Sequence, residues 1–416
     1  AGRMEICMKK ILHLIFGRFF VVAMAIILQV LWLCVVLWQL SYKFTYVNLL
    51  VRVIAIIVVL VIVNKWTNPA NKLSWTFLIL LSPIFGLMVY FLFGRSGLTK
   101  HTRERMDAVN RQVEALFQRD SAVEKGLEKE SRSAYLQSSY IDKWAGFPLY
   151  QNTQTKYYSC GEEMFPDMLE ALRGAKHFIF LEYFIIEEGY MFNTILDILE
   201  EKAKAGVDVR FIYDDVGSIN SISFGYYKKL QERGIPCVTF NPFKPLISVV
   251  MNNRDHRKIF VVDGYIGFTG GINLADEYIN KVKRFGYWKD TGVRIEGGAV
   301  WSLTAMFLEM WNAIKGTDTD YTPYFLQDGA QPHEAGLAGS VADRDVGAAQ
   351  SDANIAADSA SGFVQPYADS PLDGEPVGEN VYMGVVKAAS EYVYFTTPYL
   401  IISDEMSREL CLAAKR

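Results

Sequence analysis

Hydrophobic and polar positions divide the chain into a strongly apolar amino end and a longer region in which strand and helix patterns alternate. Three apolar stretches occur within the first 95 residues, at 19–40, 47–63 and 74–94. Residues 19–40 carry no charge and are long enough, at ~1.5 Å per residue, to cross a hydrocarbon core of ~30 Å. The pattern predicts a transmembrane helix there. A cleaved signal peptide fits poorly, because the apolar run is too long and no small-residue cleavage site follows it.

The other two stretches are weaker candidates for membrane spans. Residues 47–63 contain Arg52, and Ser82-Pro83 interrupts residues 74–94. Basic residues lie on both sides of the apolar region, and the positive-inside rule therefore places both flanks in the cytoplasm. Because this requires an even number of crossings, we expect two, with one stretch re-entrant or lying in the interface. The basic residues are Arg3, Lys9, Lys10 and Arg18 before the region and Arg95, Lys100, Arg103 and Arg105 after it.

Changes in composition divide the chain into five regions. Residues 1–98 form the expected membrane anchor, and the polar, helix-forming residues 99–135 are expected to connect it to a globule. Residues 136–320 carry the alternating strand and helix pattern of a first α/β domain. Residues 321–362 consist largely of Ala, Gly, Ser, Asp and Gln, which predicts a flexible insert. Order is expected to resume in residues 363–416.

Strand and helix patterns within the first domain predict a β-α-β unit. The apolar runs at 178–186 and 207–213 are typical of buried strands, and the amphipathic pattern at 193–205 is typical of a helix. Two strands joined in this way should be parallel, with a right-handed crossover. Further along the chain the pattern predicts a helix near 226–233, a strand at 237–240 and a helix over 299–315 that covers the sheet.

A group of polar residues at fixed spacing surrounds the next predicted hairpin. Strands at 259–262 and 266–269 flank Asp263-Gly264, and the first strand follows His256 and Lys258. Side chains two apart share a face of a strand, so His256 and Lys258 should point the same way. The full spacing, H-x-K-x4-D-x6-G-G-x-N, ends with Gly270, Gly271 and Asn273.

These residue types suit attack on the phosphorus of a phosphodiester. A largely neutral imidazole at His256 can act as nucleophile, while the Lys258 cation neutralises the nonbridging oxygens. The Asn273 amide and the backbone N–H groups near Gly270 and Gly271 are expected to donate to the same oxygens. Asp263 is expected either to orient a histidine or simply to fix the turn. The nearby carboxylates that could orient an imidazole, or serve only local structure, are Asp255, Glu182 and Glu277.

Each of these residues taken alone has an ordinary structural explanation, but the joint pattern resembles the signature of the phospholipase D superfamily. The apolar stretch from Asn68-Pro69 to Gly94-Arg95 resembles the amino-terminal region of bacterial cardiolipin synthases, with a generic membrane anchor as the alternative. The resemblance implies a mixed α/β sheet sandwiched by helices. It also implies transfer of a phosphatidyl group from one phosphatidylglycerol to another, through a phosphohistidine, to give cardiolipin and glycerol. The alternatives are another phosphatidyl transfer, plain phospholipid hydrolysis, or an inactive membrane-anchored lipid-binding protein.

The resemblance further implies two signature copies that meet at one site, and the sequence contains one. Residues 176–186 are echoed by 390–402, yet no other histidine is followed two residues later by a lysine. We therefore interpret 363–416 as the start of an incomplete second half, and expect little or no turnover from this polypeptide. A homodimer in which each chain contributes one histidine is the less favoured alternative.

Net charge and cysteine positions limit the kinds of partner and cofactor that the sequence predicts. The net charge of −4 gives no reason to expect nucleic acid, and the basic cluster at 95–111 suits either anionic lipid headgroups or an ordinary stop-transfer flank. Five scattered cysteines indicate neither a disulfide framework nor a metal site, and the chemistry requires no cofactor. We expect a multi-pass protein of the cell membrane with a cytoplasmic catalytic domain and a phospholipid substrate.

Overall fold

The computed structural model describes two compact units, one formed by residues up to Gly94 and one by residues from Lys100 onward. The described residues are 28–29, 31–32, 35, 45–65, 69–94, 100–242, 254–284, 286–317, 320–325, 362–370, 374–397 and 399–416. Most of the predicted span at 19–40 and most of the predicted insert at 321–362 therefore lie outside them.

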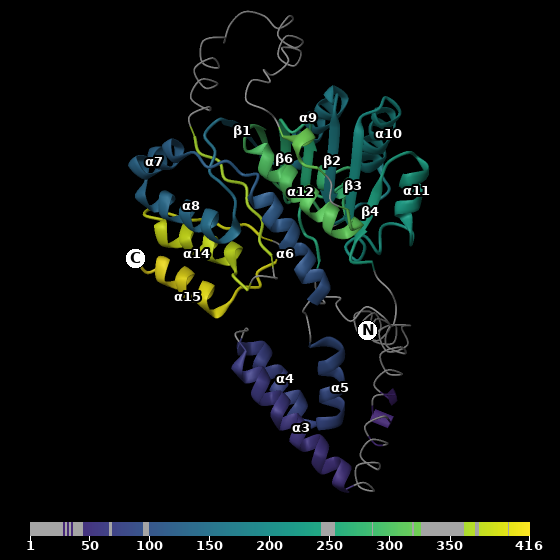
Figure 1. Cartoon of the computed structure of the whole chain (residues 1–416), viewed down its shortest axis with the longest axis vertical. Coiled ribbons are helices and arrows are strands. Elements are labelled where there is room, and N and C mark those ends of the chain that lie inside the picture. The colour runs from purple at the N-terminus through teal and green to yellow at the C-terminus, as the bar shows by residue number, and fades with distance from the viewer. Residues whose placement is uncertain are drawn as a thin grey trace, which may run out of the picture. The chain divides into compact units, whose positions relative to one another are not determined.

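The first unit contains three described apolar helices, α3 (Thr45–Asn64), α4 (Pro69–Leu81) and α5 (Pro83–Phe93) (Figure 1). Among the described residues, one helix is long and apolar enough to cross a membrane, over Tyr46–Asn64. Arg52 does not interrupt it, whereas Ser82-Pro83 divides the third apolar stretch into two helices. The helices pack on one another through a small buried cluster, Ala55, Ile62, Ile79, Leu87 and Tyr90.

The second unit is built on a seven-stranded mixed sheet in the order β1-β7-β6-β5-β2-β3-β4. Strands β2, β3 and β4 are parallel, and the remaining neighbours are antiparallel. The predicted parallel β-α-β unit and the strand at 237–240 are confirmed. The strands are β1 (Thr153–Tyr158), β2 (Phe178–Tyr183), β3 (Asp208–Asp214), β4 (Cys237–Phe240), β5 (Ile259–Val262), β6 (Ile266–Gly270) and β7 (Gly292–Gly297).

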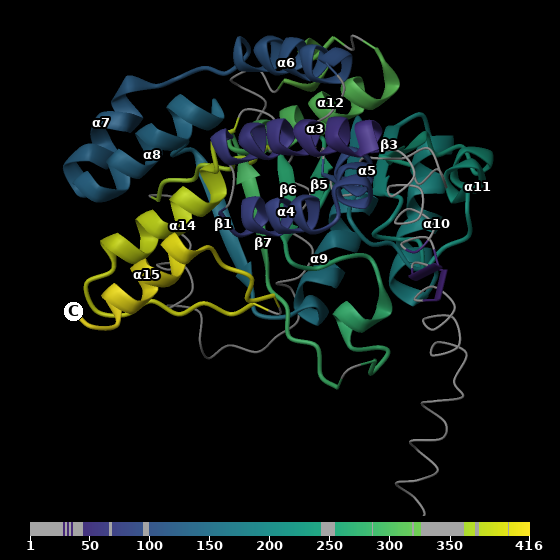
Figure 2. The same ribbon diagram turned by 90° about the horizontal axis from the view of Figure 1, so that it is seen from below.

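Helices cover both faces of this sheet, as the view from below shows (Figure 2). On one face lie α9 (Gly161–Gly174) and α10 (Tyr190–Lys204), and on the other α12 (Val300–Lys315), against which α6 (Lys100–Glu114) packs. Because alternate strand side chains point to opposite faces, β2 supplies Ile179 and Leu181 to one core and Phe178 and Phe180 to the other. The α/β fold class, a mixed sheet sandwiched by helices, is thus confirmed.

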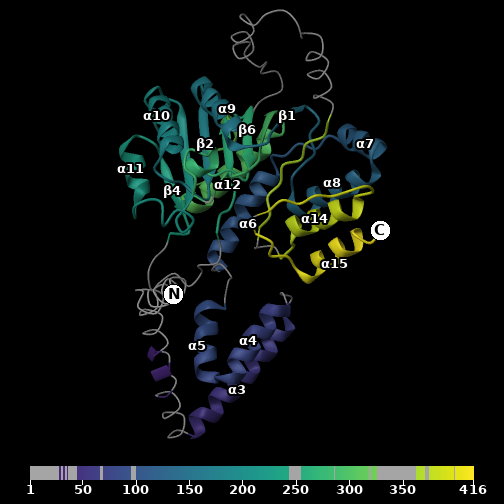
Figure 3. The same ribbon diagram turned by 180° about the vertical axis from the view of Figure 1, so that it is seen from behind.

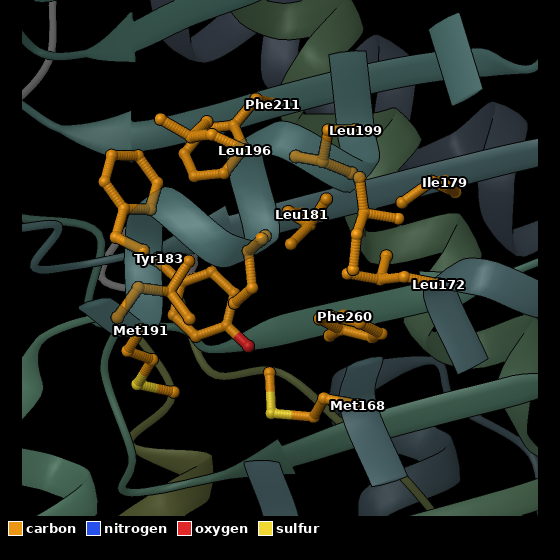
Figure 4. Close-up of a cluster of buried hydrophobic side chains, with 14 of the residues drawn as sticks. Met168, Leu172, Ile179, Leu181, Tyr183, Met191, Leu196, Leu199, Phe211 and Phe260 are labelled. Carbon is orange, nitrogen blue, oxygen red and sulfur yellow. The ribbon is translucent and has the colours of Figure 1, made fainter. Parts of the chain in front are cut away.

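The core on the α9 and α10 face is dense and almost wholly apolar. Figure 4 shows side chains of the strands, such as Leu181 and Phe260, meeting those of the two helices. Shorter helices complete the unit: α11 (Tyr226–Glu232) and the 3₁₀ turns η1 (Asp276–Ile279) and η2 (Thr322–Tyr324).

A helical layer lies beside the sheet. It contains α7 (Ser121–Glu130), α8 (Arg132–Ala145), α14 (Val377–Ala388) and α15 (Asp404–Ala413), and α14 packs against both α8 and α15 (Figure 3). Between α14 and α15, the described residues of 390–402 form neither helix nor strand. The sequence echo of β2 therefore does not enter a sheet within the described structure.

Candidate active site

His256 and Lys258 lie at the edge of the sheet where the parallel strands end. Strands β2 and β3 run toward this edge, and β5 starts from it because it is antiparallel to β2. The segment just before β5 therefore crosses the carboxyl ends of its neighbours. His256 is exposed there, whereas Lys258 keeps only 5% of its surface accessible.

Both side chains contact the ring of Phe184, the residue that follows β2. The imidazole of His256 lies 4.7 Å from the Phe184 ring, centroid to centroid, and the Lys258 ammonium lies 5.4 Å from the same centroid. Lys258 Nζ also donates to the backbone carbonyl of His256 at 2.7 Å. A cation on a ring face gains electrostatic attraction, which helps to hold the buried ammonium in place. The pair therefore shares one aromatic support.

The surroundings of the pair lower the pKa of both groups. For Lys258, desolvation lowers the pKa to about 8, against the opposing pull of Asp255 and Asp290. For His256, desolvation and then the neighbouring Lys258 cation hold the pKa below its usual value. At neutral pH the imidazole is therefore largely neutral and the ammonium largely charged. This is the combination that nucleophilic attack on a phosphodiester requires.

A buried carboxylate that sequence reasoning missed fixes the backbone before His256. Asp214 ends β3, is fully buried, and accepts the backbone N–H of Asp255 at 3.0 Å and that of Gly217 at 2.8 Å. Arg254 Nη1 lies 3.5 Å from the same carboxylate. Burial raises the pKa of Asp214, while these donors act in the opposite direction. The sequence signal was its place at the end of a buried strand, which is also common for ordinary turn residues.

Asp263 lies at the opposite end of β5 from His256. Its carboxylate accepts backbone N–H groups of Lys176, His177 and Phe178, at 2.7 to 2.9 Å. Its own backbone is left-handed, with φ 51°, where the chain turns toward β6. Of the two roles expected for Asp263, the geometry supports fixing the turn. The structure does not bring it to the imidazole, because the length of β5 separates them.

The glycine pair and Asn273 also have structural partners. Gly271 N–H donates to the carbonyl of Thr291 at 3.1 Å, so this group is not free for a phosphate. An added Cβ would lie 2.4 Å from the Thr291 carbonyl oxygen at Gly270 and 2.0 Å from Asp290 Oδ1 at Gly271, which explains the need for glycine at both positions. The Gly271 N–H is therefore used within the fold, and a glycine at this position allows close packing against the Asp290 side chain.

Asn273 is buried and joins two loops at the carboxyl edge of the sheet. Its Oδ1 accepts from Ile185 N at 3.0 Å, and its Nδ2 donates to the Tyr278 hydroxyl at 2.9 Å. One of these loops begins at Phe184, which supports the histidine and the lysine. Asn273 therefore fixes the backbone directly behind the aromatic support.

The carboxylates that were candidates for orienting an imidazole have other neighbours. Glu182 points to the α12 face, where Arg257 lies 3.9 Å away, and burial followed by Asp255 raises its pKa. Asp255 Oδ1 accepts the backbone N–H of Arg257 at 3.1 Å. Glu277 pairs with Arg284 at 3.3 Å. All three hold local structure in these contacts.

Asp290 is a further carboxylate that the sequence did not single out. Its negative charge acts on the Lys258 ammonium and raises the pKa of that group. It also accepts from the indole N–H of Trp288 at 3.3 Å and from Thr291 N at 2.8 Å. Asp290 therefore helps to keep the buried lysine charged.

Comparison with known proteins identifies both parts of the chain. Residues 168–287 match the family described as cardiolipin synthase, PLD-like domain, and residues 53–95 match the phospholipase D-nuclease N-terminal family. Among solved structures, a phospholipase D family member, Nuc from Salmonella typhimurium, aligns with 41% of this chain and 97% of its own. The sequence identity is 23% and the TM-score 0.30.

Relatives align over most of the chain. An uncharacterized protein from Streptococcus mutans is 39% identical over 358 residues, which cover 86% of this chain and 72% of the relative. Cardiolipin synthase 1 of Bacillus cereus is 32% identical over 379 residues, covering 89% and 69%. Cardiolipin synthase 1 of Bacillus anthracis is 31% identical over 380 residues, covering 89% and 69%. The chain therefore belongs to the cardiolipin synthase family of the phospholipase D superfamily.

Proposed function

We propose that this protein transfers a phosphatidyl group from one phosphatidylglycerol to another, giving cardiolipin and glycerol. The observation that carries the proposal is the pairing of an exposed, largely neutral imidazole with a buried cation on one aromatic support. Similarity to cardiolipin synthases over most of the chain supports the choice of substrate.

In the proposed first step, a ring nitrogen of His256 attacks the phosphorus of phosphatidylglycerol. A nitrogen–phosphorus bond forms, the phosphorus–oxygen bond to the glycerol headgroup breaks, and the leaving oxygen takes up a proton. In the second step, the primary hydroxyl of another phosphatidylglycerol attacks the same phosphorus and loses its proton, which releases His256. Lys258 stabilises the charge on the nonbridging oxygens in both steps.

The protons in this scheme need a second acid/base group, which the family resemblance assigns to the histidine of a second motif. The sequence 1–416 contains one H-x-K-x4-D. His177 does not complete the site, because it lies beside Asp263 at the opposite edge of the sheet. The polypeptide 1–416 should therefore turn over natural substrate slowly by itself. A second copy that contributes its own His256 is the less favoured source.

The other motif residues are proposed to position the pair rather than to touch the substrate. Asp263 fixes the β5–β6 turn, and Asn273 fixes the loop behind Phe184. Gly270 retains the expected donor role toward the phosphate, because it is exposed at the end of β6.

We also propose a location at the cell membrane with the catalytic domain in the cytoplasm. The described helix α3 is long and apolar enough to cross a bilayer, and basic residues flank the apolar region. A phospholipid substrate suits this location. Nothing in the net charge favours nucleic acid as a partner.

A substrate with a leaving group that needs no proton separates the first step from the second. We expect 1–416 in lipid micelles to release a burst of one p-nitrophenolate per chain from a phosphatidyl p-nitrophenol, because this anion leaves unprotonated. His256→Ala should abolish the burst, whereas the control His177→Ala should retain it. A burst that survives His256→Ala would reject His256 as the nucleophile.

The acceptor is tested by the products of labelled phosphatidylglycerol. For a form of the protein that carries a second H-x-K-x4-D motif, thin-layer chromatography of the products should show cardiolipin and glycerol in equal amounts. Phosphatidic acid as the sole product would reject the synthase and favour hydrolysis. Turnover of natural substrate by 1–416 alone at rates normal for an enzyme would overturn the need for a second motif.

A further inference from the structure

The third apolar stretch is folded into two short helices, neither of which is long enough to cross a membrane. Helix α4 has 13 residues and α5 has 11. At 1.5 Å per residue these helices are about 20 Å and 17 Å long, against a hydrocarbon core of about 30 Å. Only α4 and α5 joined end to end, as one straight helix, would reach across.

The two helices instead lie side by side. The rings of Trp75 on α4 and Tyr90 on α5 meet edge to face, with centroids 5.4 Å apart. In one straight helix these two positions, 15 apart in the sequence, would be separated by about 22 Å. The bend occurs at Ser82, whose backbone leaves the helical region at φ −139° and ψ 85°, directly before Pro83. The stretch is therefore an antiparallel hairpin, which is also visible in Figure 1.

The backbones of α4 and α5 approach each other closely at Gly86. A Cβ at Gly86 would lie 2.6 Å from Ile79 Cα and 2.6 Å from the Leu78 carbonyl oxygen, so a side chain at this position would force the two helices apart. Ile79 is completely buried against this contact. Small residues allow membrane helices to approach in this way.

The open end of the hairpin lies beside the carboxyl end of α3. Lys72 Nζ, near the start of α4, donates to the carbonyl of Val63 at 3.1 Å. The outer surface of the hairpin is apolar and exposed, and no described residue covers it. Its exposed side chains are Leu73, Phe77, Leu80, Leu81, Met88 and Phe91.

We propose that α4 and α5 form a re-entrant hairpin that enters one leaflet from the side on which α3 ends and returns to that side. The acyl chains of that leaflet cover its apolar surface. This proposal rests on the proposed membrane attachment but not on the proposed reaction. It assigns the two crossings to 19–40 and α3, and it places Lys65, Lys72 and the chain from Lys100 onward on one side. That arrangement satisfies the positive-inside rule with an even number of crossings.

Crosslinking within the hairpin tests its closure. With the five native cysteines replaced by alanine, the double variant Trp75→Cys/Tyr90→Cys should be joined by a short bis-maleimide in native membranes. The control pair Tyr46→Cys/Tyr90→Cys should not, because Tyr46 lies at the far end of α3. Absence of the first crosslink, while both single cysteines react with a small maleimide, would overturn the hairpin.

Sidedness tests the re-entrant topology without altering the hairpin. Single cysteines at Tyr46, Lys65 and Ala108 are labelled with an impermeant maleimide in sealed inverted vesicles. We expect Lys65→Cys and Ala108→Cys to react fully and Tyr46→Cys to react only after detergent. Ala108→Cys behaving like Tyr46→Cys would show that the stretch crosses, and would overturn the proposal. Extraction of the protein by alkaline carbonate would instead reject the membrane attachment on which the proposal rests, whatever the outcome of the p-nitrophenolate assay.

Discussion

Strand β2 and its sequence echo at 390–402 have similar residues and opposite environments. All six residues of β2 are buried, and β2 is paired with β3 on one side and β5 on the other. Phe180 has no exposed surface, whereas Tyr394, its counterpart in the echo, is 85% exposed. The comparison shows that an apolar β-type sequence becomes a strand through its neighbours in the sheet, because local preference depends on what the side chains pack against.

The comparison extends to chemistry. The end of β2 carries Phe184, on which His256 and Lys258 both rest. The echo leads instead into α15, and its apolar side chains face solvent in the described structure. These exposed side chains are Tyr392, Tyr394, Phe395, Tyr399, Leu400, Ile401 and Ile402. The end of β2 thus forms part of a site because β5 pairs with it and places His256 and Lys258 beside Phe184.

Removal of the His256 imidazole should have the largest effect. It would show that the chemistry takes place at the end of β2 and not at the echo. His256→Ala is expected to lower the rate of p-nitrophenolate release on the order of 10³-fold or more, as for loss of a nucleophile. The rate is measured by stopped-flow absorbance, and an unchanged melting temperature confirms that the fold is intact. Residual activity near the wild-type level would mean that the chemistry lies elsewhere.

The matched pair Phe180→Ala and Tyr394→Ala tests the difference in packing directly. Phe180→Ala should cost about 3–5 kcal/mol of unfolding free energy, because it opens a cavity between β2 and α12. Tyr394→Ala should change stability by less than about 0.5 kcal/mol in the same polypeptide. Denaturant titration followed by circular dichroism measures both. Equal costs would show that the echo is packed in solution as β2 is.

Asp214→Asn tests whether the neighbouring strand positions the imidazole. One N–H of the new amide would face a backbone donor, so the segment before His256 should shift and the burst rate should fall roughly 10- to 100-fold, about 1–3 kcal/mol. The burst amplitude should remain near one per chain, because the nucleophile is intact. The adjacent Asp215→Asn is the matched control. A loss of stability with an unchanged burst rate would assign Asp214 a purely structural role.

The pH dependence of the burst rate should show the smallest effect. The rate should fall about tenfold per pH unit at the acid and alkaline ends of the profile. Below the lowered pKa of His256 the imidazole is protonated and cannot attack, so the rate falls as pH decreases. Above about 8 the Lys258 ammonium loses its proton, so the rate falls as pH increases. Lys258→Arg should remove the alkaline limb, because arginine stays charged. An alkaline limb that persists in this variant would exclude Lys258 as its source.

Sequence patterns predicted the elements of the sheet more completely than the contacts of the site. The strand at 237–240 and the helix over 299–315 were found because buried strands and amphipathic helices leave a periodic signal. The role of Asp263 stayed open because residue spacing does not show which groups its carboxylate meets. Its partners are the backbone N–H groups of Lys176, His177 and Phe178, at the end of β5 away from His256.

Other contacts leave no sequence signal. Asp214 acts through a backbone N–H 41 residues later in the chain, and no pattern of residue types encodes such a partner. Likewise, Ser82-Pro83 predicts a break, but the ring contact between Trp75 and Tyr90 depends on the direction of the bend. Such contacts are set by tertiary packing.

The hydrogen bonds that Asp263 accepts from the start of β2 also have a consequence for synthesis of the protein. Its carboxylate holds amides that precede it by 85 to 87 residues. At a translation rate of roughly 5–20 residues per second, those amides leave the ribosome about 4 to 17 s before their acceptor. Strand β2 therefore keeps one edge unpaired until β5, in the hairpin that follows His256, has been synthesised and pairs with it. Assembly of the site is thus a late event on the nascent chain, and a ribosome pause between residues 214 and 254 would prolong the interval in which that edge can aggregate.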